Sequence, residues 1–352
     1  MKVLYGVQGT GNGHIARARA MCSALKKRGV EVDYLFSGRD ESNYFAMEEF
    51  GAYRTCKGLS FVTEKGKVSY SKTAAAVRPW RLMRDIQTLD LSPYTLILND
   101  FEPVSAWAAK RQGKTTISIS HQNAFRHNVP LRGANWFDKQ MIQHFAPATH
   151  HIGLHWYHFE QPLLPPIIAT LPVEAELESF ILVYLPFEAC ADIGHWLRQV
   201  PNQHFICYHP EVREPYRSNN IEFRPPSRHG FQRALKQCLG VVANGGFELP
   251  SEALSLGKKI LLKPLKGQFE QLSNAATLDA LGLATMMEEL DLTILGDWLQ
   301  EPAAERVGYP DVAGAICDWL LQGAWHDQKN LASHLWSQVN FPTYVSNFAN
   351  EY

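Results

Sequence analysis

Three glycines and a histidine lie close together near the start of the chain. Gly9, Gly11 and Gly13 alternate with other residues in the segment QGTGNGH, and His14 follows the last glycine. Glycines allow a tight turn with exposed N–H groups, and such a turn at the start of a helix binds anions. The spacing predicts a phosphate site that uses Gly11 and Gly13; a turn without a ligand is the alternative. The dinucleotide fingerprint is not met, because His14 stands where its third glycine belongs.

His14 has the position of a proton acceptor. A helix N-terminus disfavours the cationic form of a histidine ring, so we expect this ring to be able to take up a proton. A residue on the loop after a strand of an open α/β sheet also faces the cleft where ligands bind. His14 is therefore a candidate general base, and a histidine that only caps the loop is the alternative.

A second glycine turn lies in the segment VVANGGFELPSEALSLG, residues 241–257. It repeats the order strand, turn and helix, with proline and serine in the first helical turn. Its backbone amides predict an anion site on the opposite wall of a cleft. The turn consists of Asn244, Gly245, Gly246 and Phe247. Glu252, about one turn into the helix, can accept two hydrogen bonds from a ribose diol, or else only complements the helix dipole.

Glu270 and Gln271 are adjacent polar residues at the start of a further expected helix, in the segment FEQLSNA. This helix follows an expected strand at 259–262, so its first turn belongs to the same edge of the sheet. One carboxylate and one amide together can bind several sugar hydroxyls. An ordinary solvated helix start is the alternative.

The elements that must position these loops alternate between short apolar runs and amphipathic helices, which is typical of doubly wound α/β domains. In the first part of the chain we expect strands at 2–7, 30–36, 95–98 and 115–120 and a helix at 104–111. In the second part we expect strands at 180–185, 204–208, 221–223, 239–243 and 259–262. Helices are expected there at 191–199, 230–237 and 250–256. The two halves would face each other across a central cleft.

A proline-rich segment, Gln161–Pro172, predicts a stiff linker between the halves. We therefore expect an N-terminal Rossmann-like domain at 1–165 and a C-terminal Rossmann-like domain at 166–335. The tail is expected to form three helical pieces from Asp311 onward, and the last part, 336–352, to pack back on the N-terminal domain.

Composition limits the partners and the location of the protein. The 34 basic and 35 acidic residues give a net charge of −1, so we expect no nucleic-acid partner. The six cysteines form no CxxC pair, which is typical of reduced thiols in the cytoplasm. The first apolar run is too short for a signal peptide, and no run reaches the ~20 residues that span a bilayer. We expect a cytoplasmic protein, at most peripheral to the inner face of the membrane.

Taken in order, these motifs resemble nucleotide-sugar glycosyltransferases of the GT-B fold. The GTGNGH loop, the glycine turn followed by SEALSLG, and FEQLSNA carry the resemblance, which spans residues 3–285 with thin matches between 40 and 95. The pattern is similar to the bacterial lipid-intermediate N-acetylglucosamine transferases and their uncharacterised relatives. The segment SHQNA, 120–124, is similar to that family's HEQNA without the glutamate. The resemblance implies an acceptor-side N-terminal domain and a C-terminal domain that binds the nucleotide sugar.

The resemblance also assigns roles to the donor-side residues. Glu252 would hold the ribose, and Glu270 and Gln271 would hold the donor sugar. The amides of Gly245–Phe247 would bind the diphosphate.

On the other side of the cleft, the resemblance places His14 near the reacting centre and His121 and Asn123 near the acceptor. Two departures matter: the family's loop is usually GTGGH, and its Gly-Gly-Tyr acceptor loop is replaced here by NDFEP, residues 99–103. The replacement introduces Asp100 and Glu102, which rival His14 as catalytic base. The acceptor is therefore expected to differ, and a glycan, a lipid-linked sugar and a small molecule remain open.

The function that the resemblance implies is transfer of a sugar from a nucleotide-diphosphate donor, preferably a UDP sugar, to a hydroxyl group. We expect inversion at the anomeric carbon and no metal or cofactor, because fixed amides and a helix N-terminus can stabilise the leaving diphosphate. Two alternatives are a nucleotide-sugar 2-epimerase and a non-catalytic protein that binds nucleotide sugars. A nicotinamide oxidoreductase is disfavoured by the incomplete fingerprint.

Three weaker patterns complete the sequence analysis. Basic and apolar residues at helical spacing predict a face for an anionic acceptor or a membrane surface, or else a solvated face; they are Arg78, Trp80, Arg81, Met83 and Arg84. The run of His150, His151, His155 and His158 fits no metal-site spacing, and no metal is expected. Arg228 and His229 are candidates to lie over the nucleotide base.

Overall fold

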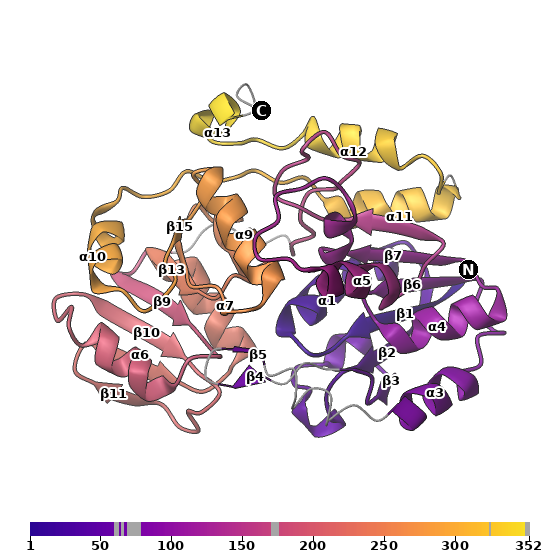
Figure 1. Ribbon diagram of the computed structural model, residues 1–352, viewed down its shortest axis with the longest axis horizontal. Helices are drawn as coiled ribbons and strands as arrows, with labels where there is room; N and C mark the ends of the chain where they lie inside the picture. The colour runs from indigo at the N-terminus through magenta and orange to yellow at the C-terminus, as the bar shows by residue number, and fades with distance from the viewer. Residues whose placement is uncertain (60–62, 65–66, 69–78, 170–175, 324, 349–352) are drawn as a thin grey trace.

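The computed structural model describes residues 1–59, 63–64, 67–68, 79–169, 176–323 and 325–348. Figure 1 shows two α/β halves side by side, the first on the right and the second on the left. Arg78 and Pro172, named above, lie outside the described residues.

The first half contains a six-stranded parallel sheet in the order β3-β2-β1-β6-β7-β8. Its strands are β1 (Lys2–Gln8), β2 (Glu31–Ser37), β3 (Tyr53–Cys56), β6 (Leu96–Asp100), β7 (Thr116–Ser120) and β8 (His150–Gly153). The helices are α1 (Asn12–Lys27), α3 (Pro79–Thr88), α4 (Pro103–Gln112) and α5 (Trp136–His144). A short two-stranded sheet joins β4 (Thr63–Glu64) to β5 (Lys67–Val68). β1 is continuously apolar because helices cover both faces of this sheet, and all of it after Lys2 is buried.

The second half contains a seven-stranded sheet in the order β11-β12-β10-β9-β13-β14-β15, in which only β11 runs antiparallel to its neighbour. The strands are β9 (Phe180–Tyr184), β10 (His204–Tyr208), β11 (Tyr216–Ser218), β12 (Ile221–Arg224), β13 (Gly240–Ala243), β14 (Lys259–Leu262) and β15 (Thr285–Met286). The helices are α6 (Cys190–Leu197), α7 (Arg228–Gln237), α8 (Glu248–Ser255), α9 (Phe269–Ala280) and α10 (Leu292–Gln300). The sequence predicted neither short edge strand, β11 nor β15.

The two halves share one continuous hydrophobic core. It extends from Val3 in β1 through Trp156 to Leu262 in β14. Trp156 is fully buried, and its Nε1 donates a hydrogen bond of 2.8 Å to Ser251 Oγ of α8. The halves therefore pack directly against each other.

The C-terminal tail corrects one expectation. It forms α11 (Val312–Gln322), α12 (Gln328–Trp336) and α13 (Thr343–Phe348) along the top of Figure 1. The return to the first half begins with α11, before residue 336, because its apolar face packs on α1 and Asp318 pairs with Arg28 at 2.6 Å. Within 336–352, Trp336 Nε1 donates to the Leu163 carbonyl at 2.7 Å and the Phe341 ring lies 5.9 Å from the Tyr157 ring, both in the first half. Tyr344 of α13 lies beside Gly282 in the second half.

Two observations concern membranes. Within the described ranges, no helix has both the length and the apolar character needed to cross a bilayer. On α3, Trp80 is 88% exposed and Met83 is 49% exposed, and Arg81 and Arg84 are exposed beside them.

Candidate active site

The loop between β1 and α1 forms one wall of the site. Gly11 precedes the first residue of α1, and nothing lies within 4 Å of where its Cβ would stand. At Gly13 the space is tighter, because a Cβ there would lie 3.0 Å from Glu248 Cγ of the second half. The first glycine loop and the start of α8 are therefore in direct contact across the cleft.

His14 and Asp100 form a hydrogen-bonded pair at the carboxyl ends of β1 and β6. His14 Nδ1 lies 2.8 Å from Asp100 Oδ1, and Asp100 is fully buried. Burial would raise the pKa of Asp100, but the Arg17 guanidinium and the His14 ring outweigh it and hold that pKa below its usual value. In the tautomer whose Nδ1–H donates to the ionised Asp100, Nε2 is the proton acceptor of the ring. Asp100 thus orients His14, and its predicted role as a rival base is wrong because no face of it reaches the cavity.

Arg17 is a site residue that the sequence analysis missed. It donates to both oxygens of Asp100, through Nε and Nη2, each at 2.8 Å, and Nη1 donates to Glu248 Oε1. Asp100 and Glu248 hold the pKa of Arg17 above its usual value although burial opposes them. The sequence contained one signal for Arg17, namely its spacing. Arg17 lies three residues after His14, and residues i and i+3 share one face of a helix.

Glu102 has a structural role, which corrects its prediction as a catalytic base. It caps α4, and its two oxygens accept four hydrogen bonds of 2.6 to 2.7 Å, from the amides of Val104 and Ser105 and the hydroxyls of Ser37 and Ser105. The side chain is fully buried. Burial raises the pKa of Glu102 although these donors oppose the shift. A carboxylate with its acceptor capacity used in this way has no lone pair for a substrate.

The second glycine turn lies between β13 and α8 and contacts α9. A Cβ at Gly245 would stand 2.5 Å from the carbonyl oxygen of Gln271, whereas one at Gly246 would meet nothing within 4 Å. Asn244 is buried and donates from Nδ2 to the Lys263 carbonyl at 2.8 Å, which fixes the end of β13. The turn is thus packed on one side and open on the other, as an anion site on backbone amides requires.

His121 and Asn123 do not form an acceptor surface, and that expectation is corrected. The His121 ring is fully buried, stacks on Phe247 at 4.0 Å and hydrogen-bonds to Asn274 at 2.7 Å, so it joins the two halves. Asn123 is buried and bonds within the first half, donating to the Ser118 carbonyl at 3.0 Å. Both lie behind the site because the short 3-10 helix after β7 turns them into the core.

Gln122, between these two residues, is the one that reaches the cavity. Its Nε2 donates to Glu270 Oε1 at 3.0 Å, across the junction between the halves. Gln122, Glu270 and Gln271 all line the same cavity as His14. The structure thus brings together the sugar-binding candidates at 270–271 and the base candidate at 14.

This cavity has a volume of about 360 Å³ and is lined by both polar and apolar residues. Its polar lining residues include His14, Gln122, Asp138, Glu270 and Gln271. Its larger apolar lining residues are Phe101, Phe137, Met141, Ile142, Phe145, Phe187, Leu265 and Phe269. Phe137 of α5 is 50% exposed, so the apolar wall continues to the surface.

A second cavity of about 160 Å³ lies on the other side of the first glycine loop. Gly13, Glu248 and Glu252 line it together with the aromatic rings of Tyr184, Tyr208 and Phe231. Burial raises the pKa of Glu252 to about 7, and Gln232 donates to it at 3.1 Å. Carboxylate and flat aromatic groups in one cavity suit a nucleoside.

Of Arg228 and His229, the residues predicted to lie over the nucleotide base, only Arg228 lines the second cavity. Arg228 pairs with Glu49 at 2.7 Å. His229 is exposed and is not among the lining residues, because it points away from this face of α7.

The histidine run has no common ligand position. His151 Nδ1 contacts Asn123, His155 Nδ1 accepts from the Trp156 amide, and His158 Nδ1 accepts from the Glu160 amide. In the part of the chain that the structure describes, one other group could hold an ion, namely Cys190, His209 and Glu211. Both ring nitrogens of His209 are already engaged, by the Glu188 carbonyl and the Glu211 amide.

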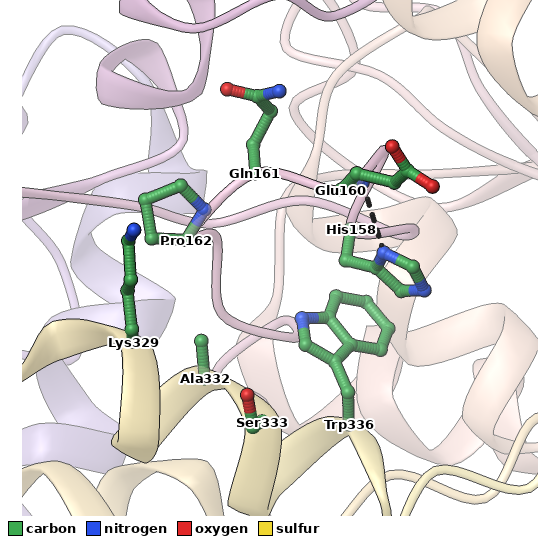
Figure 2. A pocket seen from close by; sticks show the side chains of 8 residues that line it. All are labelled: His158, Glu160, Gln161, Pro162, Lys329, Ala332, Ser333 and Trp336. Atoms are coloured by element: carbon green, nitrogen blue, oxygen red, sulfur yellow. Dashed lines mark hydrogen bonds between the residues drawn. The ribbon is translucent and has the colours of Figure 1, made fainter.

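A further hollow of about 360 Å³ lies away from the glycine turns, between the His158–Pro162 segment and α12. Figure 2 shows Lys329 and Trp336 of α12 facing Pro162 and His158 across it. None of its lining residues belongs to the glycine loops or to the His14 pair.

Two Rossmann-like halves, in contact where Gly13 of the first glycine loop meets Glu248 at the start of α8, define the class of GT-B nucleotide-binding enzymes. A family model described as glycosyl transferase family 1 matches residues 1–302. The chain belongs to this family and is a glycosyltransferase. The fold class and the enzyme class predicted from the motifs are confirmed.

Solved structures agree with this fold. The glycosyltransferase SsfS6 from Streptomyces sp. SF2575 has a TM-score of 0.57 and 13% identity, over 100% of this chain and 99% of its own. The same protein complexed with thymidine diphosphate has a TM-score of 0.58 and 12% identity, over 100% and 99%. SnogD from Streptomyces nogalater has a TM-score of 0.54 and 15% identity, over 100% and 98%. No curated protein matches the chain.

Proposed function

We propose that this glycosyltransferase moves a sugar from a nucleoside diphosphate to a hydroxyl group with inversion, and that His14 is the base. The observation that carries the proposal is the position of His14, which lines the cavity while its Nδ1 lies 2.8 Å from the buried Asp100. Asp100 keeps the ring in one tautomer and stabilises the imidazolium that forms, and Nε2 faces the acceptor. A positioned base of this kind contributes ~10²–10⁴-fold to the rate.

The donor would lie along the second half. The amides of the 245–247 turn and the N-terminus of α8 are suited to the diphosphate, and Glu252 to the ribose. Glu270 and Gln271 are suited to the donor sugar because they line the cavity that also contains His14. We propose a UDP sugar as donor, by the resemblance above, and compare it with a TDP sugar because SsfS6 has been solved with thymidine diphosphate.

In the proposed step, the acceptor oxygen attacks the anomeric carbon from the side opposite the diphosphate. The new carbon–oxygen bond forms as the bond to the diphosphate breaks, so the anomeric configuration inverts. The acceptor proton passes to Nε2 of His14, and the diphosphate leaves with the bonding electron pair. Preorganised amides at α8 stabilise that charge without reorganisation, which is why we propose a reaction without a metal.

The acceptor would occupy the apolar part of the His14 cavity. Five phenylalanines in its wall suit a molecule with an apolar body that carries one reactive hydroxyl. A lipid-linked sugar and an apolar small molecule both meet this description. For the first of these, the exposed face of α3 supports peripheral contact with a membrane.

The test is transfer by purified protein with UDP and TDP sugars and a panel of apolar alcohols, with nuclear magnetic resonance of the anomeric proton. We expect His14→Gln to lower kcat by ~10²–10⁴-fold. His195→Gln is the matched control, because His195 is exposed on α6 and lines neither cavity. Equal loss in both variants, or retention of configuration, would refute the proposed mechanism.

The same panel separates the two alternatives. A nucleotide-sugar 2-epimerase converts the donor when no acceptor is present, so a second nucleotide sugar would appear in that control. A binding protein takes up the nucleotide without turnover on any acceptor, and its affinity is insensitive to His14→Gln.

A further inference from the structure

Arg17 binds two carboxylates that belong to different halves of the molecule. Its Nε and Nη2 donate to Asp100 at the end of β6, each at 2.8 Å. Its Nη1 donates to Glu248, in the first turn of α8. All three side chains are at least nine-tenths buried. The guanidinium is always charged and its planar fork fits such shared pairing, which a lysine would not reproduce.

The same guanidinium lies against the proposed base. Arg17 Nη2 is 3.0 Å from His14 Nδ1, and both atoms lie 2.8 Å from Asp100 Oδ1. A cation at this distance disfavours proton uptake by the ring, whereas Asp100 favours it. The His14 ring is therefore held between a fixed anion and a fixed cation.

Other titratable groups face this cluster from the elements packed against it. They are Tyr5 of β1, His121 after β7, Glu248 and Glu252 of α8, and, across the cavity, Asp138 and Glu270. Glu248 alone among them bonds directly to Arg17. A change at Glu248 therefore reaches His14 through Arg17.

We propose that Arg17 is a positioning residue, which through Asp100 sets the tautomer and proton affinity of His14, and that Glu248 of the opposite half holds Arg17 in place. The base is then complete only where the two halves meet. This inference rests on the proposed function, because it takes His14 as the base. A merely structural ion pair is the competing explanation, and it predicts lost stability without any change at the His14 ring.

The proposal predicts shifts of opposite sign in two variants. Arg17→Met removes the cation, so His14 should stay protonated to a pH higher by about one to three units. Burial raises the pKa of Glu248 to about 8 although Arg17 opposes the shift. Glu248→Gln keeps the shape and an acceptor oxygen but removes the negative charge that compensates Arg17 in the upper part of the titration, so the midpoint should move to lower pH. Glu188→Gln is the matched control, because Glu188 is a largely buried carboxylate that pairs with Lys263 and does not contact Arg17.

The measurement is a pH titration of the full chain with ¹⁵N,¹³C-labelled histidine. His14→Gln identifies the His14 signal among those of the 14 histidines. We expect the Nδ1–H tautomer in the parent protein, opposite shifts in Arg17→Met and Glu248→Gln, and no shift in Glu188→Gln. If Arg17→Met does not fold, as judged by circular dichroism, the direction of the shift of the His14 midpoint in Glu248→Gln alone tests the proposal.

Identical His14 midpoints in the parent and in Glu248→Gln would overturn the proposal, whatever happens to the melting temperature. Calorimetric binding of uridine diphosphate and thymidine diphosphate to the parent keeps the two proposals apart. Failure of both nucleotides to bind would refute the proposed donor site, and opposite midpoint shifts in that case would still support the role of Arg17.

Discussion

Gly245→Ala offers a sharp test of how the donor loop and α9 fit together. The added Cβ would stand 2.5 Å from the carbonyl oxygen and 3.1 Å from the carbonyl carbon of Gln271. Carbon contacts are optimal at ~3.5–4.0 Å, so the backbone of the loop or of α9 must move by about 1 Å. Overpacking of this kind typically costs ~1–3 kcal/mol.

The movement also reaches the proposed sugar site. Glu270 and Gln271 lie in the first turn of α9 and line the His14 cavity. A misplacement of about 1 Å can lower a catalytic rate by ~10²-fold. We therefore expect Gly245→Ala to lower both the free energy of unfolding, measured in urea by circular dichroism, and the rate of sugar transfer.

Gly246→Ala is the matched control for this prediction. It carries the same chemical change one residue later, where nothing lies within 4 Å of the new Cβ. Neither glycine has a positive φ, so the change in unfolded-chain entropy is similar for both, at ~0.4–1 kcal/mol in favour of folding. Gly246→Ala should be as stable as the parent or slightly more stable. Equal unfolding free energies for the two variants would refute the packing argument.

Two further predictions concern buried carboxylates. Glu102→Gln should lower the free energy of unfolding by ~1–3 kcal/mol, because an amide N–H₂ would face groups that now donate to Glu102. The pH dependence of sugar transfer should stay that of the parent protein. A displaced pH profile would restore Glu102 as a candidate base. Burial raises the pKa of Glu252 to about 7, so the native state binds more protons than the unfolded chain above pH ~4.5, and unfolding free energy should fall as pH rises toward 7. Glu252→Gln should reduce this fall in urea titrations at several pH values and should weaken binding of uridine diphosphate, and unchanged affinity would remove Glu252 from the donor site.

Much of the fold was predictable because its signals are local. The apolar run predicted at 2–7 matches β1 to within one residue at each end. The short edge strands β11 and β15 gave no comparable signal, since two or three residues show no clear alternation. The start of the return to the first half was also missed, because only the packing of α11 on α1 defines it.

The candidate site likewise has features that local sequence signals predict and features that depend on tertiary packing. Residue type and loop position made His14, the glycine turn at 244–247, Glu252, Glu270 and Gln271 candidates, because loops that follow parallel strands must gather at one edge of the sheet. The same reasoning treated Asp100 and Glu102 alike, although one orients His14 and the other caps α4. Two carboxylates two residues apart on a loop point in different directions, and no local pattern says which one meets the cavity.

The sequence by itself determined the α/β fold and the class of enzyme, and it predicted the two glycine turns as anion sites, since each of these depends on spacing over a few residues. Only the tertiary structure decided which groups meet: Arg17 with Glu248 across 231 positions of chain, and Gln122 with Glu270 across 148. Buried charges are stable only when paired, and the partner can come from any element that packs nearby. The pairing that builds the site is therefore a property of the docked halves.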